Sequence, residues 1–202
     1  MGIEQQKVGD LLDSIAARQP VPGGGAVAAL TAALSSALGR MVVEYSQGKK
    51  SAAGHEAAHA EILSALTGLQ AAALALADAD AQAFTRLSGL WKLKPDDPRR
   101  RSEWPGAVAA CIDAPSRVMD ASLEALDCLE RLSASVGANI RSDLAISALL
   151  AQAGAEAAAC NVRINLPLLA DAAAARRIEA DTARRLELAA SRRFAVAEAC
   201  RG

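Results

Sequence analysis

The sequence predicts an all-α protein, a single-domain bundle of long, Ala-rich and mostly buried helices. Hydrophobic residues make up 52% of the 202 residues, and the abundance of alanine favours helix formation along most of the chain. Apolar residues recur at steps of three and four in several segments, which is the spacing of one helix face. No segment shows the apolar–polar alternation of a half-buried strand, and no repeat is visible. A chain of this length can bury a sizeable core, so residues 1–202 are predicted to form one domain.

The first helix is predicted from about Glu4 to Arg18. It carries apolar residues on one face, namely Val8, Leu11, Leu12 and Ile15. Two prolines after Gln19 end it, because the residue before a proline disfavours helical geometry.

The central helix follows a glycine turn. The stretch Pro20–Gly39 has no charged residue, and its glycines, Gly23 to Gly25, form a turn without side chains. A helix that is apolar or small on every side is normally surrounded by protein, so we expect this one, running to about Tyr45, at the bundle centre. Its first N–H groups would suit a carboxylate or an electron-rich ring edge. The alternative is a turn and a core helix without a binding role.

Four further helices are expected. The third spans about Ala52 to Leu90, with Ser51 as N-cap, and a polar segment, Lys92 to Pro105, follows it. The fourth runs from Pro105 to Ser133 and is kinked or divided at its internal proline. The fifth helix is expected to follow its N-cap, Ser142, and to end at Asn161. The C-terminal helix is expected to follow its N-cap, Asp171.

Composition excludes several functional classes. A formal net charge of −1 and 2% aromatic residues argue against binding to nucleic acid. The uncharged stretch is about long enough to span a bilayer, but its Gly, Ser and Thr content favours burial in protein over a membrane. The first residues show no signal peptide, and four cysteines far apart without a CxxC pair indicate reduced thiols. We therefore expect a cytoplasmic protein.

Asp80 is the leading catalytic candidate. It lies in the middle of an apolar stripe on the third helix, formed by Ile62, Leu66, Leu69, Ala73, Leu76, Phe84 and Leu87. Burial would raise the pKa of its carboxyl group and prepare it to transfer a proton or to stabilise a cation. The alternative is a structural partner for an arginine or a helix end. Asp78, two positions away, falls on a more polar side.

A match to the zinc motif HExxH, at His55 to His59, starts the same helix. The chain has no other histidine, so a third ligand would have to be Asp or Glu. Asp80 would lie about 30 Å away along a continuous helix. We therefore predict no metal site.

Other polar residues have structural and functional interpretations. Lys49 and Lys50 are either solvent-facing or clamp an anionic ligand from a loop. Asn139, Ser142 and Asp143 have the chemistry of a helix start. The amides of Asn161 and Asn165 could cap a helix or read the edge of a heterocycle.

Five motifs together resemble, in order and spacing, the cyclodeaminase/cyclohydrolase family. They are Pro22-Gly-Gly-Gly-Ala-Val-Ala-Ala, Gly48-Lys49-Lys50, Asp80-Ala-Gln-Ala-Phe84, Asn139-Ile-Arg-Ser142-Asp143 and Asn161-Val-Arg-Ile-Asn165-Leu. The resemblance covers nearly the whole chain, about residues 4 to 200. This family includes the cyclodeaminase half of formiminotransferase-cyclodeaminase and the stand-alone methenyltetrahydrofolate cyclohydrolases of bacteria.

The resemblance implies a homodimeric helical bundle that binds a folate substrate and needs no metal or other cofactor. In the cyclohydrolase, water adds to the cationic carbon that bridges N5 and N10. In the cyclodeaminase, N10 attacks the formimino carbon on N5 and ammonia leaves. Asp80 matches the family's aspartate and would stabilise the amidinium and shuttle a proton, and Lys49 and Lys50 would hold the glutamate carboxylates. The glycines Gly23, Gly24 and Gly25 would admit the ligand, and the remaining motif residues would line or brace the pterin pocket: Asn139, Ser142, Asp143, Asn161 and Asn165.

The sequence departs from the family pattern near the expected pocket. Gly137 stands where the family commonly has Asn, and Arg141 adds a charge. Trp91 begins a stretch that differs from the usual Leu-Pro-Lys, and Trp104-Pro105 alters the next helix start. These changes concern substrate identity more than fold, and they leave open a paralogue that acts on another cyclic amidine.

We therefore predict 5,10-methenyltetrahydrofolate cyclohydrolase activity ahead of formiminotetrahydrofolate cyclodeaminase activity, which works best coupled to a transferase that this sequence lacks. A non-catalytic folate-binding or assembly subunit is the alternative from another class, and it predicts that Asp80→Asn changes nothing. A zinc peptidase is the third hypothesis, which metal analysis would decide.

Overall fold

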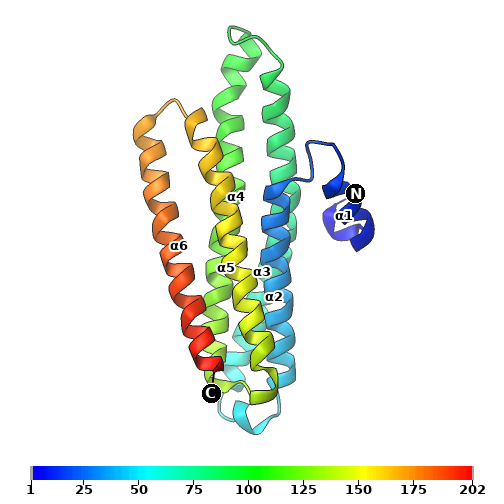
Figure 1. The fold of residues 1–202 in the computed structure, drawn as a ribbon, viewed down its shortest axis with the longest axis vertical. Helices are drawn as coiled ribbons and strands as arrows, with labels where there is room; N and C mark the ends of the chain where they lie inside the picture. Colours follow the sequence, from blue (N-terminus) through cyan, green and yellow to red (C-terminus); the bar gives the residue numbers. More distant parts are fainter. Residues whose placement is uncertain (1, 202) are drawn as a thin grey trace.

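The computed structural model describes residues 2–201, and within this range it contains six α-helices and no strand (Figure 1). The α-helices are α1 (Val8–Ala16), α2 (Gly24–Ser46), α3 (Glu56–Trp91), α4 (Pro98–Leu132), α5 (Arg141–Asn165) and α6 (Ala172–Cys200). Short 3₁₀ turns are η1 (Ile3–Gln5), η2 (Lys50–Ala52), η3 (Ser133–Ser135), η4 (Ala138–Ile140) and η5 (Leu166–Leu168). The all-α prediction is confirmed.

Helices α2 to α6 form one elongated bundle. α2 packs against α3, α4 and α5, and α6 packs on the outside against α4 and α5. α3 and α4 continue beyond the other helices as a protruding antiparallel tip (Figure 1). The upper end of α2 and the C-terminal end of α5 therefore lie at the base of this tip.

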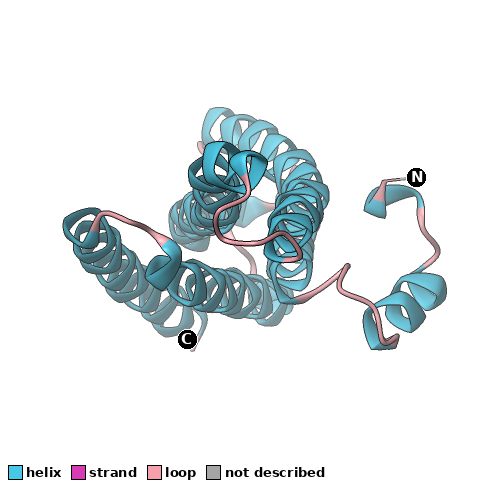
Figure 2. Ribbon diagram, turned by 90° about the horizontal axis from the view of Figure 1, so that it is seen from above, coloured by secondary structure: helices cyan, strands magenta, loops and turns pink. Residues whose placement is uncertain are grey.

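The N-terminal segment differs from the prediction. α1 is shorter than the expected Glu4–Arg18 helix, none of its residues is buried, and it stands apart from the bundle (Figure 2). Its apolar face is largely open, with Val8 74% and Leu12 59% exposed. Ile3 anchors the segment, because its side chain is buried and its N–H donates to Asp78 Oδ1 at 3.1 Å. Asp78 thus has a structural contact outside the apolar stripe of α3.

Helix α2 is covered by α3, α4 and α5, and its remaining face is exposed. Ala26, Ala28 and Ala29 are fully buried, as expected for the central helix. The expectation that protein surrounds the helix is wrong for one face, where Leu34 is 60% and Tyr45 63% exposed. The neighbouring helix α5 also carries exposed apolar residues, with Ile146 47% and Leu149 53% exposed.

Three predicted N-caps or starts are also corrected. α3 begins at Glu56 after His55, because the segment with Ser51 forms a 3₁₀ turn instead. α4 begins at Pro98, where proline tolerates the first helical turn, and Asp97 accepts N–H groups of the following residues. α5 begins at Arg141, so Ser142 lies inside its first turn rather than at the N-cap.

The remaining boundaries are explained by local chemistry. α5 continues past the predicted end at Asn161 to Asn165, where η5 follows. Asp171 caps α6 as predicted, because its Oδ1 accepts the N–H of Ala173 at 2.8 Å and of Ala174 at 3.0 Å.

Two helices, α2 and α3, have the length and hydropathy of membrane spans. Both pack against neighbouring helices, with 56% of the apolar window of α2 and 33% of that of α3 buried, and core helices of soluble proteins pass the same test. Their apolar character therefore has a direct explanation in the core.

Candidate active site

A cavity of about 470 Å³ opens at the N-terminal end of α2, below the α3–α4 tip. The glycine turn, with Asn161 and Asn165 of α5, forms its polar floor, and residues of α3, α4 and the α5–η5 corner line its sides. The lining residues are Pro20, Val21, Gly23, Gly24, Gly25, Asp80, Phe84, Trp91, Cys111, Asn161, Ile164, Asn165 and Leu168. The cavity therefore joins three of the five sequence motifs.

Asp80 lies against the first turn of α2. Its carboxylate accepts a hydrogen bond from the Ala26 N–H, one of the helix's free N-terminal donors. A methyl group on Gly25 would overlap this carboxylate, so glycine is required for the approach of α3 to α2. The anion expected at this helix N-terminus is thus the protein's own aspartate, and the predicted apolar stripe around Asp80 is confirmed by buried Leu76 and Leu87.

Burial raises the pKa of the Asp80 carboxyl group above its usual 3.8, although the Ala26 N–H bond opposes the shift. Within residues 2–201, Asp80 forms no salt bridge with a lysine or arginine. A carboxylate held without a protein cation can accept a proton or stabilise a cationic ligand. Both properties fit the chemistry expected from the sequence.

Two asparagines present amide groups to the same cavity. Asn165 Nδ2 donates to the Asn161 carbonyl at 2.8 Å and to the Cys111 carbonyl at 3.1 Å. Asn161 Nδ2 donates to the Ala157 carbonyl at 3.0 Å, and its amide faces Gly24. Both N–H donors of Asn165 are used within the protein, so its amide oxygen is left to accept a hydrogen bond from a ligand. Asn161 uses one of its two N–H donors, so its amide can both donate to a ligand and accept from it.

The sequence reasoning missed several lining residues. Burial and the charge of Asp80 raise the pKa of the Cys111 thiol to about 11, so it is protonated at neutral pH and is no nucleophile. No sequence signal connects Cys111 with Asp80, because Cys111 lies on the next helix, α4. Trp91 was placed near the expected pocket as a departure from the family pattern, but not as a lining residue, although it shares a helix face with Asp80 and Phe84 at steps of four and seven.

The structure does not bring the remaining predicted residues into this cavity. α2 has 23 residues, so its ends are ~33 Å apart at ~1.5 Å per residue, and Lys49 and Lys50 follow its far end. Asn139, Ser142 and Asp143 lie at the start of α5, at that same far end. Gly137 helps to join these loops, because a methyl group there would lie 3.1 Å from Asn139 Oδ1 and 3.6 Å from Ser51 Oγ.

In the HExxH segment, the second histidine makes a structural hydrogen bond. His59 is buried and its Nε2 is hydrogen-bonded to Ser135 Oγ at 2.7 Å, while His55 precedes α3. In the part of the chain that the structure describes, no three potential metal-ligating side chains from His, Cys, Asp and Glu come together. The histidine pair therefore has no partner ligands for a zinc site there.

The comparisons with known proteins agree with this geometry. A family model described as formiminotransferase-cyclodeaminase matches residues 7–184. The chain belongs to this family. The match covers α1 to α5 and part of α6, and confirms the resemblance drawn from the five motifs.

Individual relatives carry both activities of the family in their names. A methenyltetrahydrofolate cyclohydrolase of Methylorubrum extorquens is 32% identical over 170 residues, which is 80% of each chain. The formimidoyltransferase-cyclodeaminase of Rattus norvegicus is 29% identical over 161 residues, covering 78% of this chain and 30% of the rat protein. The solved structure of a formiminotetrahydrofolate cyclodeaminase from Thermotoga maritima has a TM-score of 0.80 and 25% identity, covering 98% of this chain and 95% of that one.

Proposed function

We propose that this protein hydrolyses 5,10-methenyltetrahydrofolate to 10-formyltetrahydrofolate. The observation that carries the proposal is the half-buried carboxylate of Asp80, which lies against the α2 turn in a cavity that opens to solvent and has no cationic residue in its lining. The substrate's bridging carbon is part of a cationic amidinium, which a carboxylate stabilises. Support also comes from the cyclohydrolase relative, which covers 80% of this chain.

Asp80 performs the proton transfers in this mechanism. Its carboxylate accepts a proton from the water that adds to the cationic carbon. The protonated group then returns the proton to N5 as the C–N5 bond breaks. The hydroxyl proton of the adduct passes to solvent, and the formyl group stays on N10. One water is consumed and one proton is released, and no metal or other cofactor is needed.

The polar floor of the cavity suits the pterin. The amide oxygens of Asn161 and Asn165 accept hydrogen bonds from the pterin's N–H groups. The turn Gly23–Gly25 lets the ring approach the backbone. Asp80 lines the same cavity as these asparagines and as the aromatic residues Phe84 and Trp91. The bridging carbon of the substrate would sit next to the Asp80 carboxylate.

Formiminotetrahydrofolate cyclodeaminase activity is the second candidate. The Thermotoga maritima structure with that name aligns along nearly the whole chain. Attack of N10 and loss of ammonia lead to the same methenyl cation, so the same carboxylate would serve. Wild-type protein and Asp80→Asn, both treated with chelator, test both reactions through the absorbance of methenyltetrahydrofolate.

Rapid decay of methenyltetrahydrofolate absorbance that survives chelator and disappears in Asp80→Asn would support the cyclohydrolase. Appearance of that absorbance from formiminotetrahydrofolate, with release of ammonia, would support the cyclodeaminase. If the absorbance changes in neither assay, both activities are refuted, and a non-catalytic folate-binding or assembly subunit is left. Activity lost to chelator and restored by zinc would contradict the metal-free mechanism.

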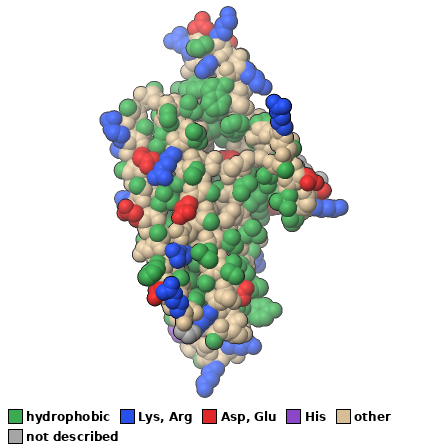
Figure 3. Space-filling view, in the orientation of Figure 1, with side chains coloured by type: hydrophobic (Ala, Val, Ile, Leu, Met, Phe, Trp, Pro, Cys, Tyr) green, Lys and Arg blue, Asp and Glu red, His purple; other side chains and the backbone are tan. Residues whose placement is uncertain are grey.

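We further propose a cytoplasmic homodimer formed through the exposed face of α2 and α5. Hydrophobic side chains are spread along this side, while charged groups in the same view lie on the α6 side, the tip, the N-terminal segment and the lower end (Figure 3). Its exposed apolar residues are Val27, Leu34, Tyr45, Ile146, Leu149 and Ile164. A two-fold axis across the middle of the face would pair the two copies antiparallel.

The antiparallel arrangement gives the distant predicted residues a role. Lys49 and Lys50 of the partner subunit would lie beside the Asp80 cavity, which has no cationic lining residue of its own. They would hold the glutamate carboxylates, and Asn139, Ser142 and Asp143 of the partner subunit would brace the same end. Each site would then be built from both subunits.

Mixing two inactive variants tests the shared site. Asp80→Asn and the double variant Lys49→Ala/Lys50→Ala are dissociated together and reassociated in equal amounts. Half of the dimers then carry one variant of each kind, and one of their two sites has no substitution, so about a quarter of wild-type activity returns. A mixture as inactive as its parts would contradict a shared site, and a monomer by ultracentrifugation would contradict the dimer.

A further inference from the structure

The few aromatic residues of this chain are concentrated at one place. The sequence holds two Trp, one Tyr and two Phe, and three of these five form a contiguous row along the α3–α4 tip. Phe84 and Trp91 meet edge to face with ring centroids 6.3 Å apart, and Trp91 and Trp104 do so at 6.0 Å. Edge-to-face pairs fix ring orientation, so Trp91 is held from both sides.

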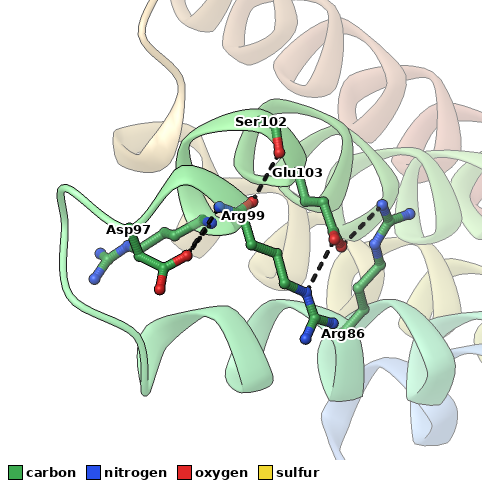
Figure 4. A network of polar contacts seen from close by, with 6 residues as sticks. Arg86, Asp97, Arg99, Ser102 and Glu103 are labelled. Atoms are coloured by element: carbon green, nitrogen blue, oxygen red, sulfur yellow. Dashed lines mark hydrogen bonds and ion pairs between the residues drawn. The ribbon is translucent and has the colours of Figure 1, made fainter.

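The row is supported from behind by polar contacts. The Arg100 guanidinium lies 4.7 Å from the Trp104 ring centroid and donates to the Leu93 carbonyl at 2.8 Å. Glu103 forms two ion pairs, as Figure 4 shows: its Oε1 lies 3.0 Å from Arg99 Nε, and its Oε2 lies 3.5 Å from Arg86 Nη2 of α3. These contacts hold the first turns of α4 against α3 and keep Trp104 behind Trp91.

The front of the row is open to the cavity. Phe84 and Trp91 line the cavity and are 36% and 43% exposed, whereas Trp104 is not part of the lining. The α5–η5 corner supplies Ile164, 73% exposed, and Leu168 to the same cavity. Because α2 packs between α3 and α5, these residues flank its first turn from two sides. The result is an apolar slot above a polar floor.

We propose that Trp91 positions the substrate by packing against its p-aminobenzoyl ring, an inference that rests on the proposed folate chemistry. The pterin carries most of the substrate's ring hydrogen-bonding groups and therefore suits the asparagine floor. The p-aminobenzoyl ring, on the N10 side of the bridging carbon, is flat and largely apolar and suits the slot. Helical side chains lean toward the helix N-terminus, so the Trp91 indole reaches back over Phe84 toward Asp80.

Two fragments of the substrate separate this role from the rest of the site. p-Aminobenzoylglutamate carries the ring assigned to the slot, and 6-methylpterin carries the ring assigned to the floor. Their affinities are measured by titration calorimetry for wild-type protein, Trp91→Ala and Trp91→Phe. Phe194→Ala is the matched control, because Phe194 is an aromatic residue 53% exposed on α6, outside the cavity.

Loss of one aromatic contact predicts about tenfold weaker binding of p-aminobenzoylglutamate to Trp91→Ala. We expect 6-methylpterin affinity to change less than about twofold, Trp91→Phe to keep most of the affinity, and Phe194→Ala to match wild type. For turnover, Trp91→Ala raises KM about tenfold and leaves kcat near its wild-type value, because the contact is made equally in ground and transition states.

Three results would overturn the inference: no binding of p-aminobenzoylglutamate to wild-type protein, equal affinity in Trp91→Ala, or a larger loss for 6-methylpterin. Unchanged melting temperatures of the variants, and the recovery in Trp91→Phe, separate a local effect from unfolding. The fragment measurements do not depend on turnover. Wild-type protein inactive on both folates would refute the proposed function, and the fragments would still decide the role of Trp91.

Discussion

The carboxylate of Asp80 occupies the space where a side chain of Gly25 would lie. This relationship joins α3 to the first turn of α2, and it explains why a glycine-rich turn and a half-buried aspartate occur in one chain. The hydrogen bond from the Ala26 N–H holds the carboxylate there. The position of the candidate catalytic group therefore depends on the absence of a single methyl group.

Gly25→Ala is expected to abolish activity and to lower the free energy of unfolding by about 1–3 kcal/mol, because the added methyl group displaces Asp80. Turnover and chemical denaturation measure the two effects. Gly68→Ala is the control, since nothing lies within 4 Å of a methyl group at that exposed position of α3. Full activity of Gly25→Ala would show that the carboxylate position does not matter.

Asp80→Asn is expected to lower kcat by about 10²–10³-fold while the protein remains folded, because the charged group is lost and the shape is kept. The raised pKa also predicts a pH effect on stability. From pH 3.8 to the raised pKa, the folded protein binds more protons at Asp80 than the unfolded chain does.

The contribution of wild-type Asp80 to stability therefore falls as pH rises through this window, and the Asn variant lacks that fall. Thermal melts of both proteins between pH 4 and 8 give the difference directly. A difference in stability that stays constant with pH would contradict a raised pKa for Asp80.

Cys111 should resist alkylation. Its pKa of about 11 leaves roughly one thiol in a thousand ionised at pH 8, and its side chain is buried. Cys160 is exposed on α5 and is the matched comparison within the same chain. Peptide mass spectrometry after brief iodoacetamide treatment should find Cys160 modified first, and faster labelling of Cys111 would disprove its protonated state.

The sequence was sufficient to predict that the protein is all-helical and to predict those site residues that follow from local patterns. Asp80 could be predicted because helical periodicity placed a carboxylate within an apolar stripe, and burial of that stripe is a direct consequence of composition. The glycine turn was recognisable because glycine permits close approach. Asn161 and Asn165 share a helix face and so could be expected together.

The separation of Lys49 from Asp80 could not be predicted from motif order. Motifs in sequence order give no distance between the two ends of a bundle. Only the structure shows that Asp80 lies at one end of α2, a helix ~33 Å long, and that Lys49 follows its other end. The open position of α1 was also missed, because an amphipathic pattern predicts an apolar face but not what covers it. The start of α4 was missed because a polar run beginning at Pro98 resembled a loop, although Asp97 caps a helix there.

The buried hydrogen bond between His59 and Ser135 should make stability depend on pH. Burial lowers the pKa of His59 from 6.5, so below pH 6.5 the unfolded chain binds more protons than the folded one. The free energy of unfolding then decreases as pH falls, by up to ~1.4 kcal/mol per pH unit for one proton.

Urea unfolding of wild-type protein and His59→Gln from pH 7.5 to 5 measures this effect. His55→Gln should keep most of the pH dependence, because burial lowers the pKa of His59 more than the charge of the exposed His55 does. Ser135→Ala should cost about 1–3 kcal/mol at pH 7.5, because the His59 ring loses its partner at 2.7 Å. Parallel pH profiles for wild type and His59→Gln would show that His59 does not titrate differently in the folded state. A zinc-dependent rise in stability that both histidine variants lose would instead assign this pair to a metal.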